Sequence, residues 1–324
     1  MMRHSRLVAM GCACGAFVFA GSAGAKSWPN RPIKMVVGFA AGGSTDVTAR
    51  LLAQALTERL GQHVVVENRG GAGGNIGADA VAKAEPDGYT VLLTTSTTHG
   101  ANPTLYKSLP FDPKADFTPI SRVAFIPNLL VVHPSVPANT IDEFVAYAKA
   151  NPDKLTYGSA GNGTSQHLSA ELFKSLAGIR MIHAPYRGGA PAVTDLISGN
   201  IQVLFAPLVE VLQFVQDGKL KALGITTAKR SPLLPSAPAI GEHLPGYEVV
   251  LWNGLLGPAK MPQDIVDRLN RETVAALASA DLKAKLAQQG SEAAGNSSDA
   301  FRRFIDSELD KWGRLVMLSG AQIQ

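Results

Sequence analysis

The sequence predicts an α/β fold of two lobes, and three observations lead to this prediction. Segments typical of strands and helices alternate along residues 26–324, which indicates a mostly parallel sheet with helices on both faces. A strand, a glycine turn and a helix follow one another at 33–47 and again at 155–165. A proline-rich stretch at 231–245 then leads to a strand that could return to the first lobe.

The first 25 residues have the pattern of an export signal. Arg3 and Arg6 give a basic start, residues 7–20 are largely apolar, and Ala23-Gly24-Ala25 has the small residues at which signal peptidase cuts. The apolar run is too short to span a membrane as a stable anchor. We therefore predict cleavage near Ala25 and an exported, periplasmic protein.

Both cysteines of the chain, Cys12 and Cys14, fall inside this segment. The mature chain would then have no disulfide and no thiolate chemistry. The alternative is a lipoprotein in which Cys12 or Cys14 carries the lipid. Without residues 1–25 the net charge falls from +4 to +2, which is too near neutral to indicate binding to nucleic acid or to a membrane surface.

The first lobe is predicted from residues 26–126 together with residues 247–324. Its opening helix has leucines at helical spacing and ends at Gly61. A glycine loop at 70–77 opens the next helix. Strands are expected at 33–39, 63–67, 89–94 and 247–256, and closing helices from Asp264, Asp281 and Ser298.

The second lobe is predicted from residues 127–246. Thr140 caps a helix through Ala150, with Glu143 at the capping-box position. Further strands are expected at 155–157, 180–183, 201–205 and 220–226, and further helices at 165–177, 191–198 and 209–216. Because the chain would cross between the lobes twice, we expect a hinge and a cleft between them.

The two glycine turns are predicted to hold an anion between the lobes. Glycine lets the backbone approach a ligand closely, and the first turn of a helix presents unpaired N–H groups and a partial positive charge. Two such helix starts that face each other make a clamp for an anion. The predicted contacts are Phe39, Ala41, Gly42, Gly43, Ser44 and Thr45 in the first turn, and Ser159, Ala160, Gly161, Asn162, Gly163, Thr164 and His167 in the second.

Each of these turns also has a structural interpretation. Either one could be an ordinary strand-to-helix turn with a Ser or Thr cap, and His167 could equally be a core or interface histidine. Asp46 would repel an anion if it faced the ligand, so we expect it to hold amides of its own loop or to favour the helix N-terminus.

Ser96 and His99 follow a buried-looking strand and are further candidates. At the carboxyl end of a strand in an open α/β sheet, such residues tend to face the crevice; the alternative is a polar loop. The loop at 71–77 imitates a dinucleotide fingerprint, but Ile76 stands where the third glycine belongs and the next strand ends without an acid. We interpret it as a packing turn and predict no cofactor and no metal. Arg187 could lie near the cleft and pair with an anion.

Several motifs together resemble one known family, the tripartite tricarboxylate transporter substrate-binding proteins, or Bug family of solute receptors. The resemblance runs from about Trp28 to the C-terminal helices. It rests on Trp28-Pro29-Asn30-Arg31-Pro32-Ile33, Gly42-Gly43-Ser44-Thr45-Asp46 with Arg50, residues 64–77, Pro86-Asp87-Gly88-Tyr89-Thr90, Asp112-Pro113, Phe117-Thr118-Pro119-Ile120 and residues 157–168. The resemblance implies a type II periplasmic-binding-protein fold and a carboxylate gripped between the two turns, often through bridging waters.

One departure from the family pattern concerns ligand type. After the strand at 201–205, many relatives place a polar or acidic residue, whereas this chain has Ala206 and Pro207. An apolar wall there would suit a ligand with an apolar or aromatic body, such as a benzoate-type acid, and we count both residues as candidate contacts.

The sequence therefore predicts a monomeric receptor, not an enzyme, that captures a di- or tricarboxylate or an aromatic acid by hinge closure. It would deliver this ligand to the membrane components of a tripartite tricarboxylate transporter. A co-receptor for a sensor kinase ectodomain is an alternative, and an α/β enzyme with a nucleotide cofactor at 71–77 is a second one.

Overall fold

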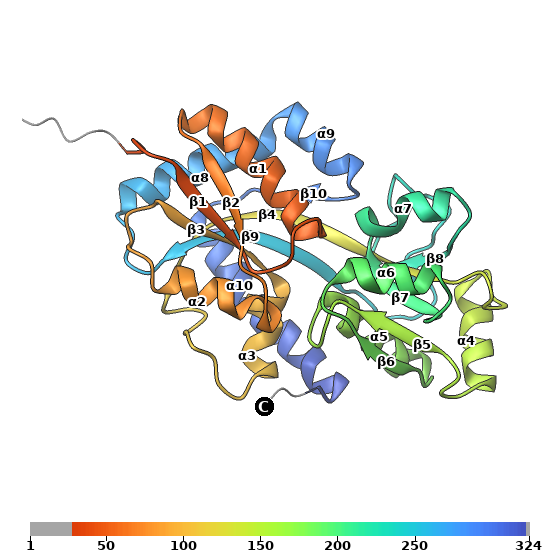
Figure 1. Cartoon of the computed structure of the whole chain (residues 1–324). Coiled ribbons are helices and arrows are strands. Elements are labelled where there is room, and N and C mark those ends of the chain that lie inside the picture. Colours follow the sequence, from red (N-terminus) through yellow and green to blue (C-terminus); the bar gives the residue numbers. More distant parts are fainter. Residues whose placement is uncertain (1–27, 322–324) are drawn as a thin grey trace, which may run out of the picture.

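The computed structural model describes residues 28–321, so the predicted export signal and its cysteines lie outside the described residues. Within this range ten strands form one sheet in the order β2-β1-β3-β9-β4-β7-β5-β6, with β8 and β10 also paired to β4. Figure 1 shows two bodies joined by the long strands β4 and β9, with the end of α10 near both. No helix in residues 28–321 is long and apolar enough to cross a membrane.

The first body is built around three parallel strands. Most residues of β1 and β3 are buried on both faces. Met35 and Leu93 pack with Leu52 of the first helix and Leu277 of a later one. Its elements are β1 (Ile33–Val37), β2 (Val64–Asn68), β3 (Thr90–Thr95), α1 (Ser44–Leu60), α2 (Asn75–Ala82), α3 (Asn102–Leu105), α8 (Gln263–Ala278) and α9 (Ala280–Gln288).

The second body repeats this plan. Its parallel strands pack around Tyr157, Phe173 and Phe205, and Thr140 caps the first of its helices as predicted. Its elements are β5 (Thr156–Ser159), β6 (Ile182–Pro185), β7 (Val203–Pro207), β8 (Lys221–Ile225), α4 (Ile141–Ala150), α5 (Ser165–Ala177), α6 (Gly189–Ile197) and α7 (Leu208–Gln216).

Two antiparallel strands connect the bodies. Strand β4 (Phe117–Val132) is a single strand of 16 residues. Its first part pairs with β9 (Val250–Pro258) and its last part with β7 and β8. The sheet is therefore more mixed than the mostly parallel sheet that the sequence predicts. The predicted lobe boundaries near residues 127 and 247 remain a prediction, because β4 passes through the first of them without a break.

The C-terminal helix α10 (Ser298–Ser319) packs against both bodies. Trp312 belongs to the core cluster of the second body, whereas Trp252 of β9 belongs to a cluster of the first. Both indole N–H groups donate to one carboxylate oxygen of Glu308, at 2.7 Å from Trp312 and 2.8 Å from Trp252. One buried side chain thus ties together residues from the two cores. The short strand β10 (Glu292–Ala293) precedes this helix and pairs with β4.

Candidate functional site

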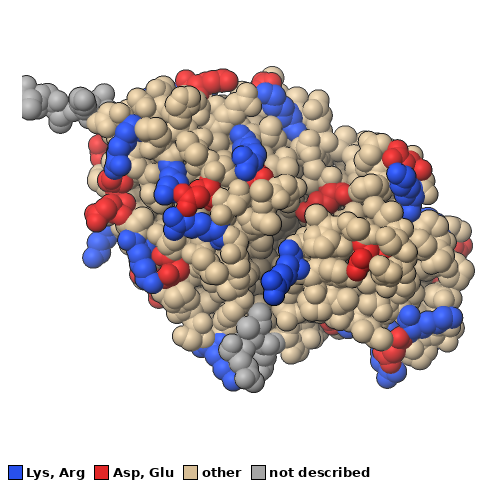
Figure 2. Space-filling model, in the orientation of Figure 1, with Lys and Arg blue, Asp and Glu red and all other residues tan. Residues whose placement is uncertain are grey.

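A cavity of about 930 Å³ lies between the two bodies. Its walls come from the segments that follow β1, β2 and β3 on one side and β5, β6 and β7 on the other. The carboxyl ends of both sets of parallel strands therefore face one space, which is where open α/β sheets bind ligands. In Figure 2 a groove runs between the bodies, and most of its wall is neither acidic nor basic.

The first glycine turn, between β1 and α1, is held by Asp46. Its carboxylate accepts hydrogen bonds from the Gly42 N–H, Arg50 Nε and Asn68 Nδ2, each at 2.9 Å. Burial alone would raise the pKa of Asp46, but the hydrogen bonds from Arg50, Gly42 and Asn68 outweigh it and hold the pKa below its usual value. The prediction that Asp46 holds an amide of its own loop is confirmed.

The N-cap of α1 is Gly43, which has no side chain to close the helix start. The free N–H groups of the first helical turn are then available to another oxygen atom. Phe39, Ala41, Gly42, Gly43, Ser44 and Thr45 all line the cavity, so the structure brings the whole predicted first turn to its wall.

The second glycine turn, between β5 and α5, is closed by its own side chains. Thr164 caps α5 by accepting from the His167 N–H at 3.4 Å, and its hydroxyl donates to the Gly161 carbonyl at 2.7 Å. The Gly163 N–H donates to His167 Nδ1 at 3.1 Å. Ser159 Oγ lies 2.7 Å from His183 Nε2. The cap that the structural interpretation expected is therefore present.

Ala160, Gly161, Asn162 and Thr164 of this turn line the cavity, whereas Ser159, Gly163 and His167 do not. His167 stacks on His183 with ring centroids 4.2 Å apart, and His183 stacks in turn on Tyr157 at 4.7 Å. Burial lowers the pKa of each histidine to about 4. His167 thus supports the turn from behind as a neutral side chain.

The structure places Ser96 and His99 in the core rather than in the cavity wall. Both are fully buried, and His99 Nδ1 lies 2.6 Å from Thr94 Oγ1, beside Phe111 and Phe117. The chain turns into a π-helical segment at Thr97–Ala101, so strand alternation no longer sets the side-chain directions there. Thr95 and Thr97 line the cavity instead.

Of the last two residues of β7, which were predicted to follow the strand, only one reaches the cavity. Ala206 is fully buried and pairs with Leu129 of β4, whereas Pro207 lines the cavity. Strand alternation explains the difference, because successive side chains point to opposite faces of a sheet.

The loop after β2, interpreted from the sequence as a packing turn, also lines the cavity through Gly70–Gly74. Its packing role is real: a Cβ built at Gly38 would lie 2.7 Å from the Gly74 Cα, so the two loops touch backbone to backbone. The Gly73 carbonyl accepts from Thr98 and Asn102, each at 3.0 Å. The sequence did hold a signal that this loop reaches the cavity: it follows a parallel strand, as both predicted turns do.

Sequence reasoning also missed much of the second wall. The sequence indicated Arg187 as a possible cleft residue. It did not indicate the residues next to Arg187, nor Gln166 and Glu210 in the first turns of α5 and α7. Tyr186 is fixed by its hydroxyl, which donates to Asp195 at 2.6 Å. The further lining residues include Tyr106, Gln166, Tyr186, Arg187, Gly188, Gly189, Ala190, Pro191, Glu210 and Phe214.

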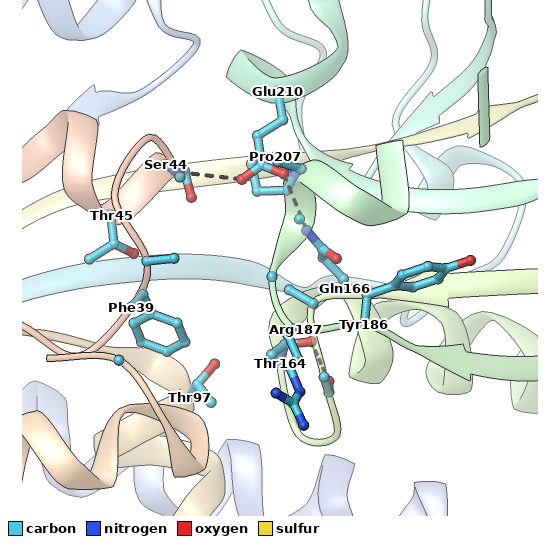
Figure 3. A pocket seen from close by; sticks show the side chains of 18 of the residues that line it. Phe39, Ser44, Thr45, Thr97, Thr164, Gln166, Tyr186, Arg187, Pro207 and Glu210 are labelled. Atoms are coloured by element: carbon cyan, nitrogen blue, oxygen red, sulfur yellow. Dashed lines mark hydrogen bonds between the residues drawn. The ribbon is translucent and has the colours of Figure 1, made fainter. Parts of the chain in front are cut away.

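Glu210 and Arg187 are the charged residues among the described residues that line the cavity. Figure 3 shows Glu210 between Ser44 and Gln166, while Arg187 extends away from it on the side of Thr97 and Thr164. No cluster of three or more His, Cys, Asp or Glu residues in 28–321 is arranged to hold a metal ion.

Two bodies joined by two strands, with a cavity at the strand ends of both, define a two-lobed solute-binding protein. The sequence profile of the family described as the tripartite tricarboxylate transporter family receptor matches residues 48–320. The chain belongs to this family, whose members are solute-binding receptors and not enzymes.

Named relatives agree with this membership. The chain is 36% identical to protein BugT of Bordetella pertussis, with 100% of both chains covered. It is similar to an R. palustris protein solved with adipate, at a TM-score of 0.88 and 38% identity over 91% of this chain and 100% of that one. It is also similar to MatC from Rhodopseudomonas palustris with bound malate, at a TM-score of 0.82 and 32% identity over 89% of this chain and 100% of that one.

Proposed function

We propose that this protein is an extracytoplasmic receptor that captures a small carboxylate between its two lobes by hinge closure. It would deliver the ligand to the membrane components of a tripartite tricarboxylate transporter. The observation that carries the proposal is the cavity itself, whose walls come from the strand ends and helix starts of both bodies. Such helix starts favour anions.

Two features support the carboxylate class. The described lining is rich in backbone and small hydroxyl groups, and holds one cation, Arg187. Similar proteins were solved with adipate and with malate. Closure would remove the ligand from water, and hydrogen bonds from oriented amides are stronger in such a protein interior than in water. Export would depend on residues 1–25, and we propose that the protein acts as a monomer.

The test is thermal denaturation of residues 26–324, stripped of co-purified ligand, against mono-, di- and tricarboxylates and aromatic acids. A ligand at about 100 times its Kd adds about 2.7 kcal/mol to the free energy of unfolding. We expect one class of acid to raise the melting temperature, with NAD as the control that does not. If NAD stabilises the protein and no acid does, the receptor proposal fails.

Delivery to a transporter requires a second experiment. Uptake of the stabilising acid is measured in cells that lack this protein, then in cells that regain it. Restored uptake supports a transporter partner. Unchanged uptake together with altered transcription in response to the acid would instead favour a sensor kinase.

A further inference from the structure

The side chain of Glu210 occupies the place where the clamp is expected to hold an anion. One carboxylate oxygen accepts from the Ser44 N–H, at the start of α1, at 3.4 Å, and the other from Gln166 Nε2, in the first turn of α5, at 3.4 Å. A Cβ built at Gly189 would lie 2.1 Å from Oε2, so the carboxylate also lies against the start of α6. Three helix starts therefore surround a carboxylate that the protein supplies itself (Figure 3).

This carboxylate has no cation beside it. Glu210 forms no ion pair within residues 28–321, and neither does Arg187, which extends to the other side of the cavity. The surrounding protein withdraws the carboxyl from water and raises the pKa of Glu210 to about 7, against the opposing effect of the Ser44 N–H. An ionised carboxylate in such a place lowers the stability of the protein unless a hydrogen-bond donor or a cation pairs with it.

A second acceptor lies beside the first. Gln166 is 3% exposed, and its Oε1 has no hydrogen-bond partner within the described residues. A buried amide oxygen without a partner is unusual in a folded protein. Glu210 therefore forms an acceptor end of the cavity, and the Gln166 Oε1 lies buried beside it without a donor of its own among the described residues.

The other side of the cavity offers donors. Arg187 is exposed there with a free guanidinium, and Thr97 and Thr164 lie on the same side. A carboxylate suits this end, because a guanidinium binds it through two parallel hydrogen bonds. Above pH 7, where Glu210 is ionised, a second carboxylate at the opposite end would meet its charge and be repelled.

We propose that Glu210 determines the ligand class, and that the ligand is a carboxylate with a nitrogen donor, an ammonium or amide N–H, at its far end. The carboxylate faces Arg187, and the nitrogen donates to Glu210. This inference rests on the proposed function, since it refines which small carboxylate the receptor takes. It separates this chain from receptors that hold a carboxylate at both ends.

The test is calorimetric titration with two matched series. One series runs through the straight-chain dicarboxylates from succinate to suberate. The other runs through the ω-amino acids with the same number of carbon atoms, in which a CH2–NH3+ group replaces one carboxylate. Adipate and 6-aminohexanoate form one such pair, and adipamate adds a neutral amide donor of the same length. We expect the wild type to bind the best nitrogen-bearing acid at least about tenfold more tightly than the matched dicarboxylate.

The decisive variant is Glu210→Gln, with Glu58→Gln as its matched control. Glu58 is exposed on α1 outside the cavity. Glu210→Gln should lower the ratio of the two affinities, nitrogen-bearing acid over matched dicarboxylate, by about tenfold or more. Glu58→Gln should leave this ratio unchanged. Denaturation of each variant checks that it is folded.

Each outcome has one meaning. If dicarboxylates bind the wild type more tightly, or if Glu210→Gln leaves the ratio unchanged, the inference fails while the carboxylate receptor stands. If no acid of either series, and none of the aromatic acids, binds the stripped wild-type protein, the proposed function fails and the inference with it.

Discussion

The two glycine turns have the same layout in sequence but differ in how their backbone N–H groups are used. At the start of α1 the N-cap is Gly43, and the Ser44 N–H reaches across the cavity to Glu210. At the start of α5, Thr164 caps the helix and His167 takes the Gly163 N–H. The first turn offers its donors to an occupant, while the second uses several of its donors within the loop.

This difference teaches that a strand–glycine–helix motif does not by itself define an anion site. The side chain at the N-cap decides how many N–H groups remain free. We therefore expect the first turn to be the binding element and the second to shape the wall of the cavity. Four substitutions can break or sharpen this comparison.

The largest effect is expected from Gly43→Val. The φ of Gly43 is −78°, and a Cβ there would lie no closer than 3.7 Å to the Ala40 carbonyl oxygen, so the fold should tolerate the change. The branched side chain would nevertheless stand at the start of α1 and enter the cavity space that the ligand is expected to fill. We expect at least about a hundredfold loss of affinity, about 2.7 kcal/mol, for the acid that stabilises the wild type most.

Calorimetry measures this loss, and thermal denaturation provides the check on folding. If Gly43→Val binds as tightly as the wild type, the first turn is not the binding element.

A second prediction concerns acid stability. Burial, with a smaller effect of the Lys174 charge, lowers the pKa of His167 to about 4, whereas an unfolded histidine titrates near 6.5. The unfolded chain therefore binds protons first, and stability is lost as the pH falls from about 6.5 to about 4. At pH 5 the loss from His167 alone should be about 2 kcal/mol.

His167→Gln should reduce this dependence, measured by urea denaturation at pH 7 and pH 5. The matched control is His63→Gln, because His63 is exposed. Equal pH dependence in both variants would mean that His167 is not held neutral.

Thr164→Ala should cost about 1 kcal/mol of stability, a typical value for loss of an N-cap side chain. The reason is that Thr164 both accepts from the His167 N–H and donates to Gly161. Ser44→Ala is the paired test, since the Ser44 side chain caps nothing, and its stability should stay within about 0.5 kcal/mol of the wild type. Equal losses in the two variants, in denaturant unfolding, would remove the distinction between the turns.

An effect of similar size, on affinity rather than on stability, is expected from Asn162→Ala. Asn162 lies exposed in the cavity wall, and its side chain makes no hydrogen bond within the described residues. Stability should not change, while affinity should fall about fivefold, about 1 kcal/mol, through loss of one ligand hydrogen bond. Unchanged affinity in calorimetry would leave Asn162 a spacer in the second wall.

Much of the fold could be predicted because it depends on local signals. Alternating apolar segments, helix caps and glycine stops are all encoded within a few residues. Strand β4 was not predicted as one element, because a lobe boundary was predicted at residue 127. In the structure the register of β4 against β9 shifts between Pro119 and Ser121, which accommodates a residue without an N–H.

The site was harder to predict than the fold. All six residues predicted in the first turn line the cavity, and Gly38 and Ala40 beside them were missed. Glu210 is 166 residues from Ser44, and its place in the cavity depends on how the two bodies face each other, which no local pattern encodes. His99 illustrates the opposite error, since alternation was extended past Ser96 into a segment that is no longer a strand.

The shared Glu308 contact gives the molecule an internal optical reporter. Of the three tryptophans in the chain, Trp252 and Trp312 both donate to this one carboxylate, from the cores of different bodies. Indole emission responds to the polarity and hydrogen bonding around the ring. Two of the three indoles of the unlabelled protein therefore lie at the junction of the bodies, where any relative rotation must be accommodated and would change their surroundings.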